Sequence, residues 1–282
     1  MDYKKINERF YSKSHWGLDR SQNKWFSKYV KVKILKKFME KVDKRVLYDA
    51  GGGVGNYGWF FGKDFKKIIV SDISKIALSK IPEKNIKKLN CSVLDNKLPN
   101  NYADCILLID VFEHIKKKDL PKMMKDLRRV LKPNGRILIF TSLFGWGVGA
   151  ITQRIFNPKK RLLSKEYKEG HVNRLTFKEF QELFKKVNLK IENYYFYSIF
   201  FQQITDGIKD NFAKIISFLL NKKKEDFELG RLGQSVKEDL RKKETKLILK
   251  IPLFFLSYVS YLDILLFNRW FPGNSIFISL KK

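Results

Sequence analysis

The chain has 282 residues, of which 44% are hydrophobic and 15% aromatic, so it can hold one large domain with an appendage and is not a disordered protein. Its 58 basic residues against 29 acidic ones give a formal charge of +29, which attracts polyanions, although scattered lysines also suit a plain solvated surface. The spacing of the two cysteines, Cys91 and Cys105, gives neither a disulfide framework nor a metal site, and no metal is predicted.

The first 45 residues predict a helical segment of their own. Aromatic and aliphatic residues recur there near helical spacing among lysines. No long apolar run follows Met1, so we expect no signal peptide and a cytoplasmic location, with contact at the inner face of the membrane left open.

Residues 46–58, VLYDAGGGVGNYG, predict a buried strand that runs through a tight glycine turn into a helix. Glycine is needed there because a Cβ would block the turn and keep the backbone away from a ligand, which the N–H groups at the following helix N-terminus face.

The glycines of this turn fit two cofactor-binding motifs. Gly53-x-Gly55-x-x-Gly58 matches the dinucleotide fingerprint, with Asp72 placed about 20 residues on as the ribose acid. The second frame, residues 49–55, begins with an acid and carries glycine at alternate positions.

Strands alternate with helical stretches from residue 46 to about residue 140, which predicts a parallel sheet with crossover helices. A helix over residues 74–80 ends before Pro82, and Thr176 with Glu179 forms a capping box that opens a helix over residues 177–187. The expected strands span residues 46–50, 67–71, 87–92, 104–109, 135–141, 189–198 and 274–280.

Residues 199–273 separate the last two expected strands. They predict an amphipathic helix, a lysine-rich hinge and an apolar stretch over residues 247–267, which at about 20 residues is long enough to span a bilayer. Pro252, Asp263 and the strand that must return to the sheet argue against a span. Packing on the domain, contact with a membrane or a lipid-like ligand, and a dimer interface stay open.

The motifs together resemble the class I S-adenosylmethionine (SAM) methyltransferases, of the small-molecule, methyltransferase type 11-like kind. The acid-first glycine frame resembles their motif I. Residues 102–115, YADCILLIDVFEHI, resemble their fourth strand and following turn, and residues 127–139 resemble their helix, proline–glycine turn and fifth strand. The resemblance covers about residues 30–195, and a dehydrogenase has no reason for this series.

The resemblance implies an α/β fold with a seven-stranded, mostly parallel Rossmann-like sheet and an antiparallel last strand. It implies an N-terminal helical lid (1–45), a SAM-binding core (46–198), a helical apolar insertion (199–273) and a closing strand of the core (274–282). The cofactor it implies is SAM.

The resemblance also implies roles for individual residues. The glycines would cradle the methionyl part with Asp49 beside them, and Asp72 would hold the ribose. Relatives commonly carry an acid where Ser92 stands, so the adenine contact stays open among three residues. The implied cofactor-binding residues are Asp49, Gly51, Gly53, Gly55, Asp72, Ser92, Val93, Asp95 and Ile109.

Transfer to a hydroxyl needs a base, and the candidates are His171, His114 and Asp110. His171 follows a glycine in a loop, which suggests exposure. His114 follows Glu113 at a strand exit and is equally expected as a structural histidine on a backbone carbonyl. The predicted reaction is methyl transfer, at oxygen, to a small-molecule or lipid-like acceptor.

Two other functions remain as alternatives: a nicotinamide-dependent oxidoreductase, and a non-catalytic protein that binds a membrane or RNA surface. Nucleic-acid methylation is disfavoured, because residues 109–112 are not a PPY-type tetrapeptide and neither cysteine has the setting of a nucleophile. The charge also suits peripheral contact with an anionic membrane. The acceptor's identity and the oligomeric state cannot be read from the sequence.

Overall fold

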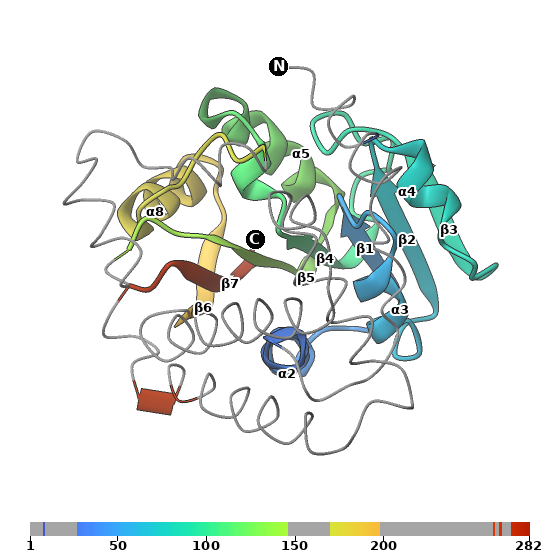
Figure 1. Ribbon diagram of the computed structural model, residues 1–282, viewed down its shortest axis with the longest axis horizontal. Helices are drawn as coiled ribbons and strands as arrows, with labels where there is room; N and C mark the ends of the chain where they lie inside the picture. Colours follow the sequence, from blue (N-terminus) through green and yellow to red (C-terminus); the bar gives the residue numbers. More distant parts are fainter. Residues whose placement is uncertain (1–7, 9–26, 146–169, 198–261, 263–264, 267–271) are drawn as a thin grey trace, which may run out of the picture.

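A computed structural model describes residues 8, 27–145, 170–197, 262, 265–266 and 272–282 of the chain (Figure 1). The strands are β1 (Val46–Ala50), β2 (Lys67–Asp72), β3 (Ile86–Asn90), β4 (Ala103–Ile109), β5 (Leu131–Ser142), β6 (Lys190–Tyr197) and β7 (Ser275–Lys281). The α-helices of the described residues are α2 (Ser27–Met39), α3 (Asn56–Gly62), α4 (Lys75–Ser79), α5 (Leu120–Val130) and α8 (Phe177–Lys186), with short 3₁₀ turns η1 (Phe112–His114) and η2 (Lys117–Asp119).

The strands form one seven-stranded sheet in the order β3-β2-β1-β4-β5-β7-β6. Neighbouring strands from β3 to β5 are parallel, and β7 is antiparallel to both β5 and β6. The predicted fold class is therefore confirmed. The antiparallel strand that closes the sheet lies between β5 and β6 rather than at the edge.

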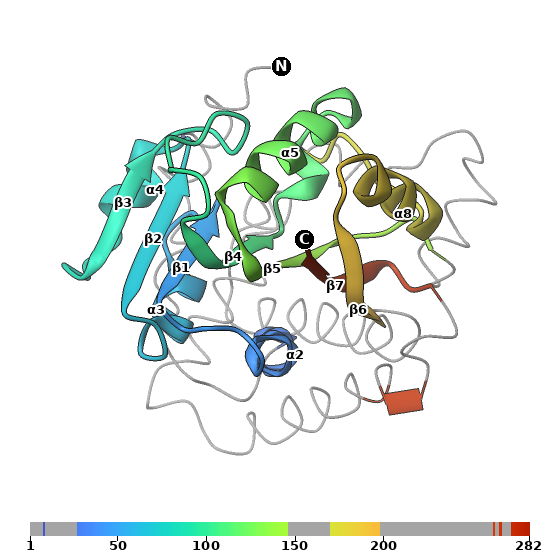
Figure 2. The same cartoon turned by 180° about the vertical axis from the view of Figure 1, so that it is seen from behind.

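Helices cover both faces of the sheet, giving three layers (Figures 1 and 2). Side chains of α5 and α8 pack into one core, whereas α2, α3 and α4 pack into the other. Alternate residues of each inner strand point to opposite cores, as Leu47 and Tyr48 do in β1. All seven residues of β4 are buried, as expected for the middle of a parallel sheet covered on both sides.

β5 begins four residues earlier than predicted. The expected strand starts at Gly135, within a proline–glycine turn, but Leu131 already pairs with Ala103. The pairing then jumps to Cys105↔Arg136, so residues 132–135 form an irregularity inside the strand. An ion pair accounts for part of this irregularity, because Lys132 Nζ binds both oxygens of the buried Asp104 carboxylate at 2.7 Å.

Most of the predicted insertion, residues 199–273, lies outside the described residues, as does most of the segment 1–26. No helix within the described residues is long and apolar enough to cross a membrane. Two of the described leucines in the insertion, Leu265 and Leu266, are 59% and 57% exposed.

The predicted capping box at the start of α8 is present. The N–H of Glu179 donates to Thr176 Oγ1 at 3.3 Å, and the N–H of Thr176 donates to Glu179 Oε2 at 2.8 Å. We expect Thr176→Ala to lower the free energy of unfolding by about 1 kcal/mol, because an N–H at the helix start loses its acceptor. Thr176→Ser keeps the hydroxyl and should lose much less. Urea unfolding measures both, and equal losses in the two variants would contradict this account.

Candidate active site

The turn after β1 is built from glycines that no other residue could replace without strain. Gly51, Gly53 and Gly55 have φ angles of 73°, 55° and 72°, in the left-handed region that side chains disfavour. A Cβ on Gly51 would also lie 2.8 Å from a methyl of Val111. The turn is therefore fixed in a shape that lets a ligand approach the backbone closely.

Two buried carboxylates accept hydrogen bonds from backbone N–H groups of this turn and of the helix after it. Asp49, in β1, accepts a hydrogen bond from the N–H of Gly58 at 3.2 Å. Asp72, at the end of β2, accepts from the N–H of Gly53 at 2.9 Å and from that of Ser74 at 2.8 Å. Because β1 and β2 are parallel neighbours, the acids at their carboxyl ends meet at the same edge of the sheet.

Burial makes the negative charge of both acids costly. It raises the pKa of Asp49 to about 7, and the N–H of Gly58 offsets this only in part, while the nearby Asp72 adds to it. Burial also raises the pKa of Asp72, against the hydrogen bonds from Ser74 and Gly53. A cationic group placed beside Asp49 would therefore favour its ionised form.

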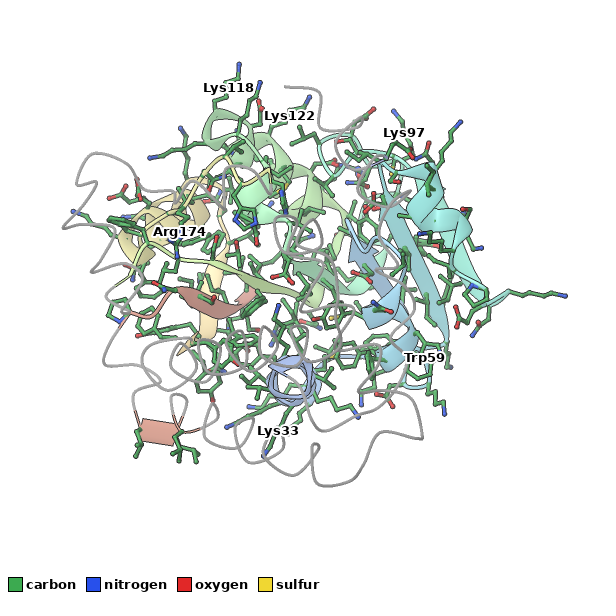
Figure 3. The ribbon with its side chains drawn as sticks, viewed as in Figure 1. Lys33, Trp59, Lys97, Lys118, Lys122 and Arg174 are labelled. Atoms are coloured by element: carbon green, nitrogen blue, oxygen red, sulfur yellow. The ribbon has the colours of Figure 1, made fainter. Side chains whose placement is uncertain are left out.

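The three adenine candidates lie in different surroundings. Val93 is buried against Gly51, where a Cβ would meet it at 3.6 Å. Ser92 Oγ accepts a hydrogen bond from the N–H of Leu94 at 3.1 Å. The Asp95 side chain is exposed and lies 2.8 Å from the ammonium of Lys97, which lowers the pKa of that carboxyl. Lys97 itself lies on the outside of the molecule (Figure 3). The structure thus brings Val93 to the turn and leaves the Asp95 side chain at the surface.

The end of β4 carries the next site residues. Ile109 is buried, and Asp110 has a φ of 57°, with its N–H bonded to the carbonyl of Phe140 at 2.9 Å. Its carboxylate pairs at 2.8 Å with Lys31 of α2, whose Nζ also lies 3.8 Å from the centre of the Phe140 ring. Nothing in the sequence distinguishes Lys31 from the other lysines of this helix, so sequence analysis missed it.

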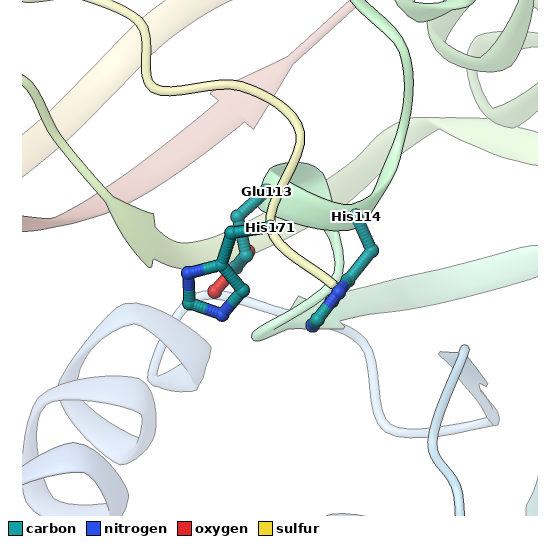
Figure 4. A group of neighbouring side chains, drawn as sticks. All are labelled: Glu113, His114 and His171. Atoms are coloured by element: carbon teal, nitrogen blue, oxygen red, sulfur yellow. The ribbon is translucent and has the colours of Figure 1, made fainter. Parts of the chain in front are cut away.

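Directly after this strand, η1 places Glu113 and His114 beside His171 (Figure 4). The two imidazole rings meet edge to face, with centroids 4.9 Å apart. The Glu113 carboxylate is buried and accepts a hydrogen bond from Thr141 Oγ1 at 2.8 Å. Sequence analysis named Glu113 as part of a motif but missed its place in the site.

Backbone hydrogen bonds bring the two parts of this cluster together. The N–H of Val172 donates to the carbonyl of Glu113 at 2.7 Å. The Asn173 side-chain amide donates to the carbonyls of Phe112, at 2.9 Å, and Ile115. His114 Nδ1 lies 3.2 Å from the carbonyl of Gly170, so the expected structural contact of this histidine exists.

Burial favours the neutral form of both histidines. Burial lowers the pKa of His171 to about 4, with His114 and Arg174 adding to the effect, and it lowers the pKa of His114 as well. Burial raises the pKa of Glu113, and the charge of Asp110 adds to it. The expectation that His171 is exposed was wrong: the ring is half-buried, because the bonds to η1 draw its loop inward.

A family model described as a methyltransferase domain matches residues 21–194, more than half of the chain. The chain belongs to this methyltransferase domain family. The match covers the glycine turn, both acids, η1 and His171. It confirms the resemblance to class I methyltransferases and leaves no support for the nicotinamide-dependent alternative.

Curated proteins that match part of the chain are methyltransferases by name, and solved structures share its fold. Two 2-phytyl-1,4-naphtoquinone methyltransferases, from Trichormus variabilis and a Nostoc species, are 29% and 30% identical over 86 residues, which is 30% of this chain and 37% of each relative. The alignment thus spans little more than a third of their length. Geranyl diphosphate C-methyltransferase from Streptomyces coelicolor has a TM-score of 0.57 at 12% identity, covering 100% of this chain and 98% of its own. The PH0226 protein from Pyrococcus horikoshii has a TM-score of 0.51 at 18% identity, covering 66% and 92%.

The described residues fit SAM as the cofactor of this methyltransferase domain. The glycine turn packs closely against neighbouring side chains, and Val93 and Val111 offer an apolar wall beside Gly51. The buried carboxylate of Asp49 could give a cationic group of the cofactor a counter-charge. Asp72 has lone pairs left for two ribose hydroxyls, because a carboxylate has about four acceptor sites and two are used by N–H groups.

We expect SAM binding at pH 6 to release about one proton per chain, because the ammonium favours the ionised form of Asp49, whose pKa in the free protein is about 7. The affinity should accordingly rise as the pH rises through 7. Calorimetry in buffers with different heats of ionisation measures the proton count. Asp49→Asn is the matched control and should release none. A variant that still released the same number of protons would contradict the assignment to Asp49.

Proposed function

We propose that the chain transfers the methyl group of SAM to the oxygen of a small, lipid-like acceptor. The observation that carries this proposal is the position of the Glu113–His114–His171 cluster next to the glycine turn. Val111 links the two, since it contacts Gly51 on one side and precedes η1 on the other. A cofactor cradle and a set of proton-accepting groups therefore share one edge of the sheet, where ligands of open α/β sheets bind.

The chain's own residues would align the reactants and take up a proton. SAM supplies an activated methyl group, which is displaced in line from the sulfonium. Asp72 would fix the ribose and Asp49 the amino-acid end, which orients the methyl group toward the cluster. Lys31, bound to Asp110 and lying over the Phe140 ring, would close this side of the site against water.

His171 is the better candidate for the base. Its Nδ1 is buried and has no hydrogen-bond partner among the described residues, whereas Nδ1 of His114 is engaged by Gly170. The acceptor hydroxyl would give its proton to a nitrogen of His171 as its oxygen attacks the methyl carbon. The nearby carboxylates of Glu113 and Asp110 would then stabilise the imidazolium.

Two features support a lipid-like acceptor. The partial relatives are named for a quinone that carries a phytyl chain. The sequence also places an apolar stretch at residues 247–267, and its Leu265 and Leu266 are exposed. We propose that the insertion binds the acceptor's chain and touches the cytoplasmic face of an anionic membrane, where each nearby lysine contributes about 1 kcal/mol.

The cofactor contact of Asp72 can be tested by substitution. We expect Asp72→Asn to weaken SAM binding about 10- to 100-fold, since charged hydrogen bonds to the ribose contribute about 1.5–3 kcal/mol. Asp64→Asn, which changes an exposed acid, is the matched control and should bind as the unaltered protein does. Calorimetry measures both. Equal affinities in the two variants would remove Asp72 from the cofactor site.

The reaction can be tested with SAM labelled in its methyl group and a panel of prenylated phenols and quinols, with and without anionic vesicles. We expect an O-methylated product, identified by NMR, and a loss of about 100-fold or more in kcat in His171→Asn with unchanged SAM affinity. A C-methylated product would contradict transfer to oxygen. SAM binding with no transfer across the panel would favour a non-catalytic surface-binding protein.

A further inference from the structure

We propose that Glu113, His114 and His171 bind a divalent transition-metal ion of the zinc type. Binding of the ion is independent of the function proposed above, and only the catalytic role assigned to the ion rests on that function. The three side chains come from two segments far apart in the sequence and converge on one point (Figure 4).

The ligand atoms are of the right kind and nearly at the right spacing. One atom from each of the three side chains, an imidazole nitrogen or a carboxylate oxygen, lies within 4.8 Å of the other two. Metal–ligand bonds of about 2.0–2.2 Å keep such atoms within about 4 Å of one another, so an ion would draw them inward by less than about 1 Å. Two histidines and one glutamate are a ligand set of catalytic zinc sites, which keep a further position open.

The outer contacts of His114 and Glu113 match those of metal ligands. His114 Nδ1 lies 3.2 Å from the Gly170 carbonyl, a bond that requires the proton on Nδ1 and leaves the lone pair of Nε2 free for a metal. Thr141 Oγ1 donates to Glu113 Oε2, which orients the carboxylate and leaves its second oxygen available. Metal-binding histidines and carboxylates are held in this way by groups behind them.

His171 supplies the third ligand from a loop that is fixed in place. The backbone bond from Val172 to Glu113, and the Asn173 amide on η1, hold this loop against the other two ligands. Nδ1 of His171 is buried without a hydrogen-bond partner among the described residues, which is costly for a polar atom unless a ligand satisfies it. Glu113 is buried as well, and a cation would compensate its charge.

An ion here would change how the acceptor is activated. Its open position would take the acceptor oxygen, and a divalent ion lowers the pKa of a bound hydroxyl, so that the proton leaves to solvent. The oxygen then forms its bond to the methyl carbon while the methyl–sulfur bond breaks and its electron pair stays on sulfur. With the ion bound, His171 is a ligand rather than the base.

The test uses the full chain without an affinity tag, stripped with EDTA, and Zn²⁺ or Co²⁺ as the probe. We expect one Zn²⁺ per chain by calorimetry, and visible d–d bands of bound Co²⁺. Glu113→Gln and His171→Asn should each weaken Zn²⁺ binding at least 100-fold, and Thr141→Val, which only removes an outer contact, about 10-fold. His15→Asn changes the third histidine of the sequence and should bind Zn²⁺ as before.

Each outcome of these binding measurements either supports or overturns the metal site. The absence of stoichiometric Zn²⁺ binding to the unaltered chain, or equal binding in His171→Asn, would overturn the metal site. If a ligand variant does not fold, as judged by circular dichroism, Thr141→Val still tests the site, and unchanged affinity there would count against it. SAM binding measured on the same samples separates the two proposals, since a chain that binds SAM but no Zn²⁺ keeps the proposed function and loses the ion.

Discussion

Two buried carboxylates, Asp49 and Asp72, hold the glycine turn at the carboxyl ends of β1 and β2. Each accepts hydrogen bonds from backbone N–H groups of the turn or of the helix after it, so the turn keeps a conformation that only glycine adopts without strain. Their charge is costly without a cation nearby, and this cost suits the site to a ligand with a positive end. The same two carboxylates thus hold the turn and would favour a cationic group placed beside them.

The Glu113–His114–His171 cluster depends on other hydrogen bonds, those that attach residues 170–173 to η1. Hydrogen bonds to the carbonyl of Glu113 fix this segment, and they place His171 against His114. Val111, which directly precedes η1, packs against Gly51 and so lies between the two parts of the site. Beyond them, β7 lies between β5 and β6 and brings the far end of the chain back to the same sheet.

The strands and helices of the core were predicted from the sequence more readily than the contacts on the acceptor side of the site. Apolar runs and capping residues predicted the strands to within a few residues, because burial on both faces of a parallel sheet leaves a strong local pattern. The start of β5 was missed, since Pro133 and Gly135 resemble a turn and the strand absorbs them as an irregularity. The contact between His171 and His114 was not predicted, because a contact between residues 57 positions apart leaves no periodic signal in the sequence.

The central claim is that the turn at Gly51–Gly55 and the Glu113–His114–His171 cluster serve one bound cofactor. The most direct measurement is a crystal structure of the full chain with S-adenosylhomocysteine. We predict the ribose hydroxyls on Asp72, the amino group near Asp49 and the sulfur facing the cluster across a space that fits an acceptor. A ligand whose sulfur points away from His171, or one bound outside the glycine turn, would contradict the account.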